Sequence, residues 1–215
     1  MSKLLLCAIF VLLSVPTFAQ VTNGDFSTGD LTGWNVFTTS NGTANAGSSP
    51  NVTLFDVTGS GASLAAHFKV GQVVGGSNNA EGGGIFQTIS FGASGIASFS
   101  ADIAVHQKFK DEDPDSGLFE MMLDGNVLDS FDIGPLSDNQ TFLSQLSASQ
   151  FVSAGDHELR FRITRPFQAG FTSDQYIDNV LAVGPLVSTV PEPSSAAIFI
   201  AGGLPLAGLL IRKRK

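Results

Sequence analysis

The sequence has almost no cysteine, tryptophan or tyrosine, and few charged residues. Each of the three residue types occurs once among 215 residues, and charged residues make up 14% of the chain. The single cysteine, Cys7, lies in an apolar run from Leu4 to Leu13 near the N-terminus. After that run there is no thiol, which excludes disulfides, thiolate catalysis and cysteine–zinc sites from the rest of the chain.

The N-terminal segment has the pattern of a secretory signal peptide. Lys3 precedes the short apolar run, and Thr17-Phe18-Ala19 places small residues three and one before a cut at Gln20. Such a run is too short for a membrane span, and a small-residue cleavage site follows it. We therefore predict that residues 1–19 are a signal peptide and that the protein is exported.

The exported part is strongly acidic. All nineteen acidic residues lie between Gln20 and Pro193, together with only six cations, so this region has a formal charge of −13. The six cations are Lys69, Lys108, Lys110, Arg160, Arg162 and Arg165. An acidic surface repels phosphate backbones, which argues against nucleic acid as a partner. It is compatible with neutral glycans and with calcium.

Residues 20–187 are predicted to form one all-β domain. Their apolar runs are short, rich in Val, Ile, Phe and Thr, and separated by Gly, Asn, Asp and Ser, as is typical of strands. The predicted strands are Trp34–Thr38, Val52–Val57, Ala62–Val70, Gly84–Phe91, Ala97–Val105, Gly117–Leu123, Asn126–Ile133, Gln140–Ser147, His157–Thr164 and Tyr176–Val183. Ten short strands at regular spacing favour a β-sandwich or jelly roll.

Two short motifs make local predictions within this domain. Asp124-Gly125-Asn126 predicts a tight hairpin turn between two strands. From His157 to Ile163 polar and apolar residues alternate, which predicts that Leu159, Phe161 and Ile163 face the core while Arg160 and Arg162 face solvent or a groove.

The last part of the chain combines three features in order. Pro191-Glu192-Pro193 precedes an uncharged apolar run from Ser195 to Ile211, which a cluster of four cations follows. The cluster consists of Arg212, Lys213, Arg214 and Lys215. As a helix the run would be about 26 Å long at about 1.5 Å per residue, close to the roughly 30 Å of a bilayer core. We predict a single transmembrane helix, with the cations on the cytoplasmic side.

These three features resemble the PEP-CTERM sorting signal of bacterial surface proteins. The resemblance covers residues 188–215 and implies recognition of Pro191, Glu192 and Pro193 by an exosortase-type transpeptidase. It implies a protein held briefly in the inner membrane and then released to the cell surface or extracellular matrix. Bacteria that carry the family make exopolysaccharide.

A second resemblance concerns the predicted domain itself. Val21–Phe26 followed by Leu31–Trp34 is similar to the opening of galactose-binding-like jelly rolls, a fold that many carbohydrate-binding modules share. Gly84–Ile89, Ala154–Leu159 and Tyr176–Val180 are similar to later strands of that fold. The resemblance implies a galactose-binding-like jelly roll. It does not define the ligand, because this fold hosts many functions.

The same resemblance implies a structural calcium ion where the first and last strands meet. Asp25 and Asp178 fall on the matching motifs, and backbone carbonyls near Asn23 together with Asp30 would complete an oxygen shell. The alternative is that Asp25 and Asp178 cap turns. The acidic run from Asp111 to Gly117 departs from the EF-hand pattern and is interpreted as a solvated loop.

No catalytic motif is present. His67, His106 and His157 lack metal-binding spacing and are interpreted as ordinary strand residues. Trp34 is expected to pack in the core. Four aromatic residues in or near loops are candidates for a glycan platform: Phe37, Phe109, Phe167 and Phe171. The leading hypothesis is a non-catalytic protein that associates with polysaccharide or the cell envelope. The alternatives are a structural or adhesive matrix protein, and a hydrolase that draws carboxylates from Glu81, Glu120 and Glu158.

Overall fold

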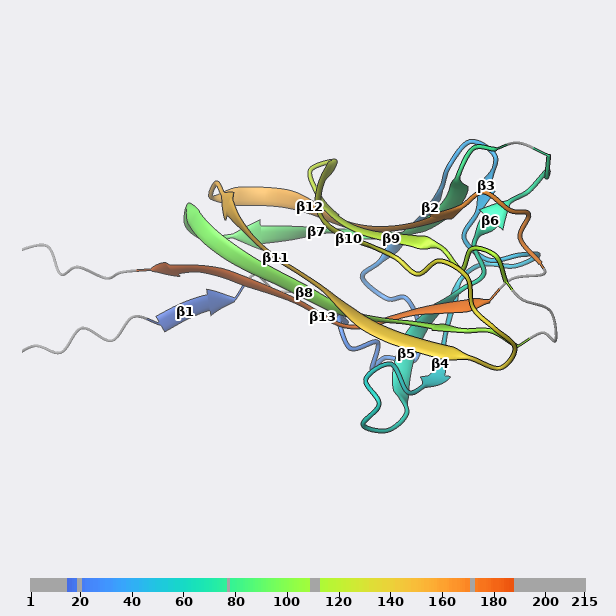
Figure 1. Cartoon of the computed structure of the whole chain (residues 1–215). Helices are drawn as coiled ribbons and strands as arrows, with labels where there is room; N and C mark the ends of the chain where they lie inside the picture. The colour runs from blue at the N-terminus through green and yellow to red at the C-terminus, as the bar shows by residue number, and fades with distance from the viewer. Residues whose placement is uncertain (1–14, 19–20, 77, 109–112, 171–172, 188–215) are drawn as a thin grey trace, which may run out of the picture. The chain divides into compact units, whose positions relative to one another are not determined.

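The protein is a two-layered β-sandwich. The computed structural model describes residues 15–18, 21–76, 78–108, 113–170 and 173–187, and all regular elements in these residues are strands. Figure 1 shows the strands stacked in two layers. The strands are β1 (Val15–Phe18), β2 (Asn35–Thr38), β3 (Gly42–Thr43), β4 (Asn51–Phe55), β5 (Ser63–Phe68), β6 (Gly71–Gln72), β7 (Glu81–Phe91), β8 (Gly95–His106), β9 (Leu118–Leu123), β10 (Asn126–Asp132), β11 (Thr141–Val152), β12 (Gly155–Arg165) and β13 (Asp174–Val187).

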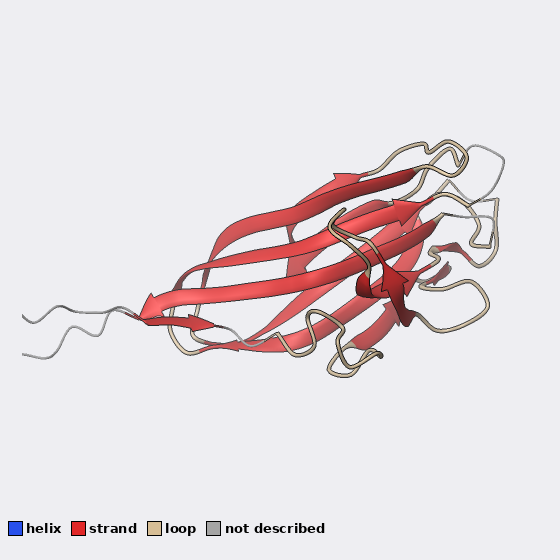
Figure 2. Cartoon of the chain, turned by 90° about the horizontal axis from the view of Figure 1, so that it is seen from below, coloured by secondary structure: helices blue, strands red, loops and turns tan. Residues whose placement is uncertain are grey.

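The strands form two antiparallel sheets. Sheet A has the order β11-β8-β13-β5-β4, and β1 pairs with β13 beside this path. Sheet B has the order β10-β9-β12-β7-β2, and the two short strands β3 and β6 pair separately. Figure 2 shows the strands in red running alongside one another, joined by loops in tan. The all-β sandwich predicted from the sequence is therefore confirmed.

Strand pairing follows a nested pattern. β9 pairs with β10, β8 with β11, β7 with β12, and β5 with β13. The chain is thus arranged as one long hairpin whose successive pairs fall alternately in the two sheets. This is the eight-stranded jelly-roll arrangement of two Greek keys.

The ten predicted strands all occur, with differences in length. β11 continues to Val152 and β13 to Val187, beyond the predicted ends. β3 and β6 were not predicted because each has only two residues.

The processing segments at the two ends of the chain remain predictions. Val15–Phe18, within the predicted signal peptide, forms β1, whereas residues 1–14, 19–20 and 188–215 lie outside the described residues. The described part of the chain contains no helix long and apolar enough to cross a membrane.

The core between the sheets follows from strand alternation. Leu159, Phe161 and Ile163 on β12 are buried, as predicted from the polar–apolar alternation. Trp34 is also buried, with its ring between Phe26 and Phe161 at centroid distances of 5.9 and 6.0 Å. Its Nε1 donates a hydrogen bond to the carbonyl of Asn23 (3.1 Å), so its one polar atom is satisfied. Trp34 is therefore a structural residue, as expected.

The β9–β10 turn positions a side chain at one end of the sandwich. Leu123 pairs with Asn126, so Asp124 and Gly125 form a two-residue loop, with φ values of 49° and 80°. Positive φ at both positions defines a type I′ turn, for which Asp-Gly is a preferred pair. The predicted hairpin is confirmed, and it places the Asp124 side chain beside β12.

Candidate functional site

The outer face of sheet A carries an unusual set of side chains. Alternate residues of its strands point away from the core, and among these are Asn51 and Phe55 on β4, His67 on β5 and Tyr176 on β13. His106 on β8 joins them beside Asp174 of β13. The outer face thus combines aromatic rings with amide, imidazole and carboxylate groups contributed by four strands.

Three rings on this face form a stack. Phe55 lies parallel to Tyr176, with ring centroids 3.8 Å apart and planes 4° apart, and His67 stacks on Tyr176 at 5.1 Å. His106 lies 6.0 Å from the Phe55 ring. Tyr176 is only 4% exposed, while Phe55 is partly exposed. Phe55 is therefore the solvent-accessible ring of the pair.

The loop between β4 and β5 lies across the same face. Its Val57 is buried against Ala65, Ala104 and Tyr176, forming a second small apolar cluster outside the main core. Further along the loop, Gly59 lies close to β11: a methyl group added at Gly59 would be 3.5 Å from the Leu143 side chain. In Figure 1 this loop lies below the lower sheet, on its outer side.

A groove lies between this loop and β11. Its volume is about 310 Å³, and it is lined by Val57, Thr58, Asp102, Leu143, Ser144 and Gln145. The lining mixes apolar and hydrogen-bonding side chains. The groove is open to the outside and is not an enclosed cavity.

Asp174 is the central charged residue of the face. It is 1% exposed, and its Oδ1 contacts His67 Nε2 at 3.1 Å and Lys69 Nζ at 3.3 Å. Lys108 Nζ contacts its Oδ2. Burial alone would raise the pKa of Asp174, but hydrogen bonds from His67 and Lys108 and the nearby positive charges outweigh it and hold this pKa well below its usual range. Burial, together with the Asp174 charge, raises the pKa of Tyr176, which therefore stays neutral.

The two predicted calcium ligands are placed differently from each other. Asp178 is fully buried, and its two carboxylate oxygens accept hydrogen bonds from Ser63 Oγ (2.6 Å) and from the Asn179 backbone N–H (2.7 Å). Asp25 is exposed in a turn, where its Oδ1 accepts a hydrogen bond from the Ser27 N–H (3.2 Å). Asp25 thus caps a turn, whereas Asp178 lies within β13 and accepts one of its hydrogen bonds from β5.

The charges around Asp178 bear on the calcium prediction. Burial, and then the charges of Asp102 and Asp25, raise the pKa of Asp178. Among the residues that the structure describes, no three His, Cys, Asp or Glu side chains are grouped to hold a metal ion. Calcium at Asp25 and Asp178 stays a prediction. Its test is a rise in melting temperature at millimolar calcium that is lost in Asp178→Ala.

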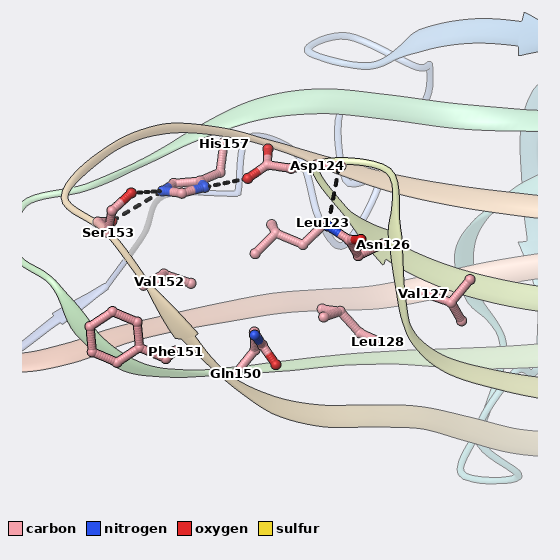
Figure 3. A pocket seen from close by; sticks show the side chains of 10 residues that line it. All are labelled: Leu123, Asp124, Asn126, Val127, Leu128, Gln150, Phe151, Val152, Ser153 and His157. Atoms are coloured by element: carbon pink, nitrogen blue, oxygen red, sulfur yellow. Dashed lines mark hydrogen bonds and ion pairs between the residues drawn. The ribbon is translucent and has the colours of Figure 1, made fainter.

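A second cavity, also of about 310 Å³, lies at the end of the sandwich (Figure 3). Its rim holds Asp124, His157 and Ser153 in a line. His157 Nδ1 lies 2.7 Å from Asp124 Oδ2, and His157 Nε2 lies 3.0 Å from the carbonyl oxygen and 3.2 Å from the Oγ of Ser153. The residue types and their order resemble a nucleophilic triad.

Hydrogen bonding argues against that chemistry. A carbonyl oxygen only accepts, so Nε2 must donate to it, while Nδ1 donates to the Asp124 carboxylate. The Asp124 hydrogen bond raises the pKa of His157, against partial burial. An imidazolium cannot remove the proton of Ser153. We therefore interpret the three residues as a clasp that holds the β11–β12 turn to the β9–β10 turn.

The outer face of sheet B has a different character. Arg160 lies over Phe37 and Phe86, with its guanidinium carbon 4.2 and 5.0 Å from the ring centroids. Arg162 forms two hydrogen bonds with Glu120, at 2.6 and 3.0 Å. Phe37, considered above as a glycan platform, is thus covered by Arg160. Phe109 and Phe171 lie outside the described residues.

The acidic run from Asp111 to Gly117 is not simply a solvated loop. Asp111 and Glu112 lie outside the described residues, but Asp113 is buried and contacts Arg165 at 2.8 and 3.2 Å. Asp113 also accepts hydrogen bonds from the N–H and Oγ of Ser173. The interpretation of this run as a solvated loop was wrong for Asp113, because its partners are distant in sequence.

The comparisons with known proteins give similar structures only. No protein family matches the sequence, and no curated protein matches it. TmCBM61 in complex with β-1,4-galactotriose is similar over 79% of this chain and 99% of its own, with 12% identity and a TM-score of 0.48. A Stig cyclase, Fisc from Fischerella sp. TAU, is similar over 80% of this chain and 99% of its own, with 14% identity and a TM-score of 0.47.

A family 35 carbohydrate-binding module from Clostridium thermocellum is also similar. It covers 79% of this chain and 98% of its own, with 11% identity and a TM-score of 0.38. These identities and TM-scores are too low to carry an argument about function, which must come from the residues themselves.

Proposed function

We propose that this chain is an exported bacterial surface or matrix protein that binds polysaccharide on the outer face of sheet A without cleaving it. The observation that carries the proposal is the Phe55–Tyr176 stack, which presents Phe55 beside imidazole and amide groups and next to a groove. Sugar rings offer an apolar face and several hydroxyl groups. An aromatic ring packs against the first, and polar side chains form hydrogen bonds with the second.

The arrangement of carboxylates favours binding over hydrolysis. Glycoside hydrolysis requires two carboxyl groups that reach the scissile bond. Asp102 and Asp178 are opposite each other in the β8–β13 register. However, Asp178 is fully buried, and both of its carboxylate oxygens accept hydrogen bonds within the protein. On sheet B, Glu120 and Glu158 are paired with Arg162 and Arg160.

Binding is tested with the full chain in mild detergent and a panel of polysaccharides, including that of the producing bacterium. We expect saturable binding to one class and a loss of about tenfold in affinity in Phe55→Ala, since a stacked ring contributes about 1.4 kcal/mol. Phe37→Ala on sheet B is the matched control and should bind as the wild type does. Equal losses in both variants would contradict the proposed face, and no binding to any polysaccharide would favour the structural or adhesive alternative.

The sorting part of the proposal rests on the resemblance of residues 188–215 to PEP-CTERM tails. Glu192→Ala should leave the uncut precursor in the inner membrane, because the transpeptidase would no longer recognise Pro191-Glu192-Pro193. Ser194→Ala, just outside the tripeptide, is the control and should mature normally. Fractionation followed by immunoblotting distinguishes the two forms, and normal maturation of Glu192→Ala would remove this part of the proposal.

A further inference from the structure

The cations of the described residues are balanced on sheet B and unbalanced on sheet A. Arg160, Arg162 and Arg165 each pair with a carboxylate of their own, from Glu158, Glu120 and Asp113. Lys69 and Lys108 instead share one carboxylate, that of Asp174. Two ammonium groups share one carboxylate, so the cluster of Lys69, Lys108 and Asp174 carries one excess positive charge.

The geometry exposes the cations and hides the anion. The Asp174 side chain is 1% exposed, whereas the side chains of Lys108 and Lys69 are 52% and 28% exposed. The buried carboxylate fixes the position of the two ammonium groups, which remain accessible from outside. A positive spot of this kind is unexpected on an exported region with a formal charge of −13.

The positive spot adjoins the aromatic stack. His67 both contacts Asp174 and stacks on Tyr176, and His106 is opposite Asp174 in register and 6.0 Å from Phe55. The ring available for stacking and the ammonium groups are therefore linked through single side chains. The aromatic ring and the ammonium groups thus lie on the same face, where one polysaccharide chain could contact both.

We infer that the polysaccharide bound on sheet A is anionic, with a carboxylate or sulfate group placed against Lys108 and Lys69 while its sugar ring packs on Phe55. This inference rests on the proposed function and specifies its ligand class. Lysine is suited to this role, because its ammonium group is a point charge that can serve Asp174 and a ligand oxygen together.

The test compares polygalacturonate with its fully methyl-esterified form, and a sulfated galactan with neutral agarose, on the full chain. Each pair holds the backbone type constant and removes the charge. We expect about tenfold tighter binding of the charged member of at least one pair, and the pair that shows it distinguishes carboxylate from sulfate. Lys108→Gln should lower that affinity about fivefold and Lys108→Arg should retain it, because the charge is kept.

The matched control is Arg160→Gln, which removes one positive charge from sheet B and should leave the affinity unchanged. Equal binding of charged and neutral members, abolished by Phe55→Ala, would overturn the inference while leaving polysaccharide binding intact. No binding of any polysaccharide would overturn both. If Lys108→Gln does not fold, the comparison of charged and neutral polymers on the wild-type chain still tests whether the bound polysaccharide is anionic.

Discussion

The outer faces of the two sheets use the same kinds of residues in opposite ways. On sheet B an aromatic pair, Phe37 and Phe86, lies under Arg160, and the neighbouring Arg162 is held by Glu120. On sheet A the aromatic rings stack on each other, and two lysines share one buried aspartate. Sheet B satisfies its charges internally, while sheet A leaves an aromatic ring and ammonium groups for an external partner. This difference is the reason why we propose the outer face of sheet A as the binding face.

The largest effect on stability is expected at the buried ion pair between Arg165 and Asp113. Asp113→Ala would leave Arg165 buried and unpaired, and we expect it to lower the free energy of unfolding by about 3–5 kcal/mol. Urea denaturation measures this. Asp113→Ala combined with Arg165→Met should recover part of the loss, because the second change removes the buried charge. A loss below about 1 kcal/mol in the single variant would contradict a tightly coupled pair.

A smaller effect is expected at the shared aspartate of sheet A. Asp174→Asn should lower the free energy of unfolding by about 2 kcal/mol at pH 7, since hydrogen bonds to charged partners are lost while Lys69 and Lys108 keep access to water. Because the folded-state pKa of Asp174 is lowered, its stabilisation is present above the unfolded-state value of about 3.9 and is lost as pH falls through the folded-state value. The difference between wild type and variant should therefore narrow below about pH 4.

The control for this pH dependence is Asp138→Asn, which changes an exposed aspartate. It should shift the free energy of unfolding by less than about 0.5 kcal/mol at every pH. A difference between wild type and Asp174→Asn that stays constant from pH 7 to pH 3 would show that the ionised carboxylate is not what stabilises this site.

The smallest effect is expected at the clasp of Asp124, His157 and Ser153, which holds the β11–β12 turn to the β9–β10 turn. The pKa of His157 is raised in the folded state. Its contribution to the stability of the fold is therefore complete below about pH 6.5, the unfolded-state pKa, and is lost as pH rises through the folded-state pKa. Asp124 has a lowered pKa: partial burial opposes ionisation, but hydrogen bonds from His157 and the Glu158 N–H outweigh it. The Asp124 contribution is therefore lost at acid pH, and the clasp is strongest between about pH 4 and 6.5.

His157→Gln should remove this dependence and cost about 1 kcal/mol near pH 6. Thermal denaturation at pH 6 and pH 8 measures it, with His106→Gln as the control on sheet A. If the wild type and His157→Gln lose stability equally between pH 6 and pH 8, the imidazolium clasp is contradicted.

Much of the fold could be predicted because it depends on local patterns. The alternation from His157 to Ile163 gave the inward and outward faces of β12 correctly. Asp124-Gly125-Asn126 correctly predicted a tight hairpin turn, which is of type I′ in the structure. Trp34 was correctly assigned to the core. These features depend on residues within a few positions of one another, where periodicity and turn preferences apply.

The proposed binding face could not be predicted in the same way. Asp174 meets His67, Lys69 and Lys108 only because β13 lies between β5 and β8 in sheet A, and no local motif connects these positions. Asp113 was assigned to a solvated loop for the same reason, since its partners Arg165 and Ser173 follow it by more than fifty residues. The aromatic residues considered as a platform included Phe37, which Arg160 covers, but not Phe55, whose neighbours on the face come from other strands.

Hydrogen exchange of the full chain, with and without the bound polysaccharide, tests the central claim most directly. Mass spectrometry of peptides from each strand reports which backbone amides become protected on binding. We predict that protection increases in β4, β5, the loop between them and the first residues of β13, while β2, β7 and β12 are unchanged. Protection confined to sheet B, or to the turns around Asp124 and Ser153, would contradict the assignment of the outer face of sheet A as the binding site.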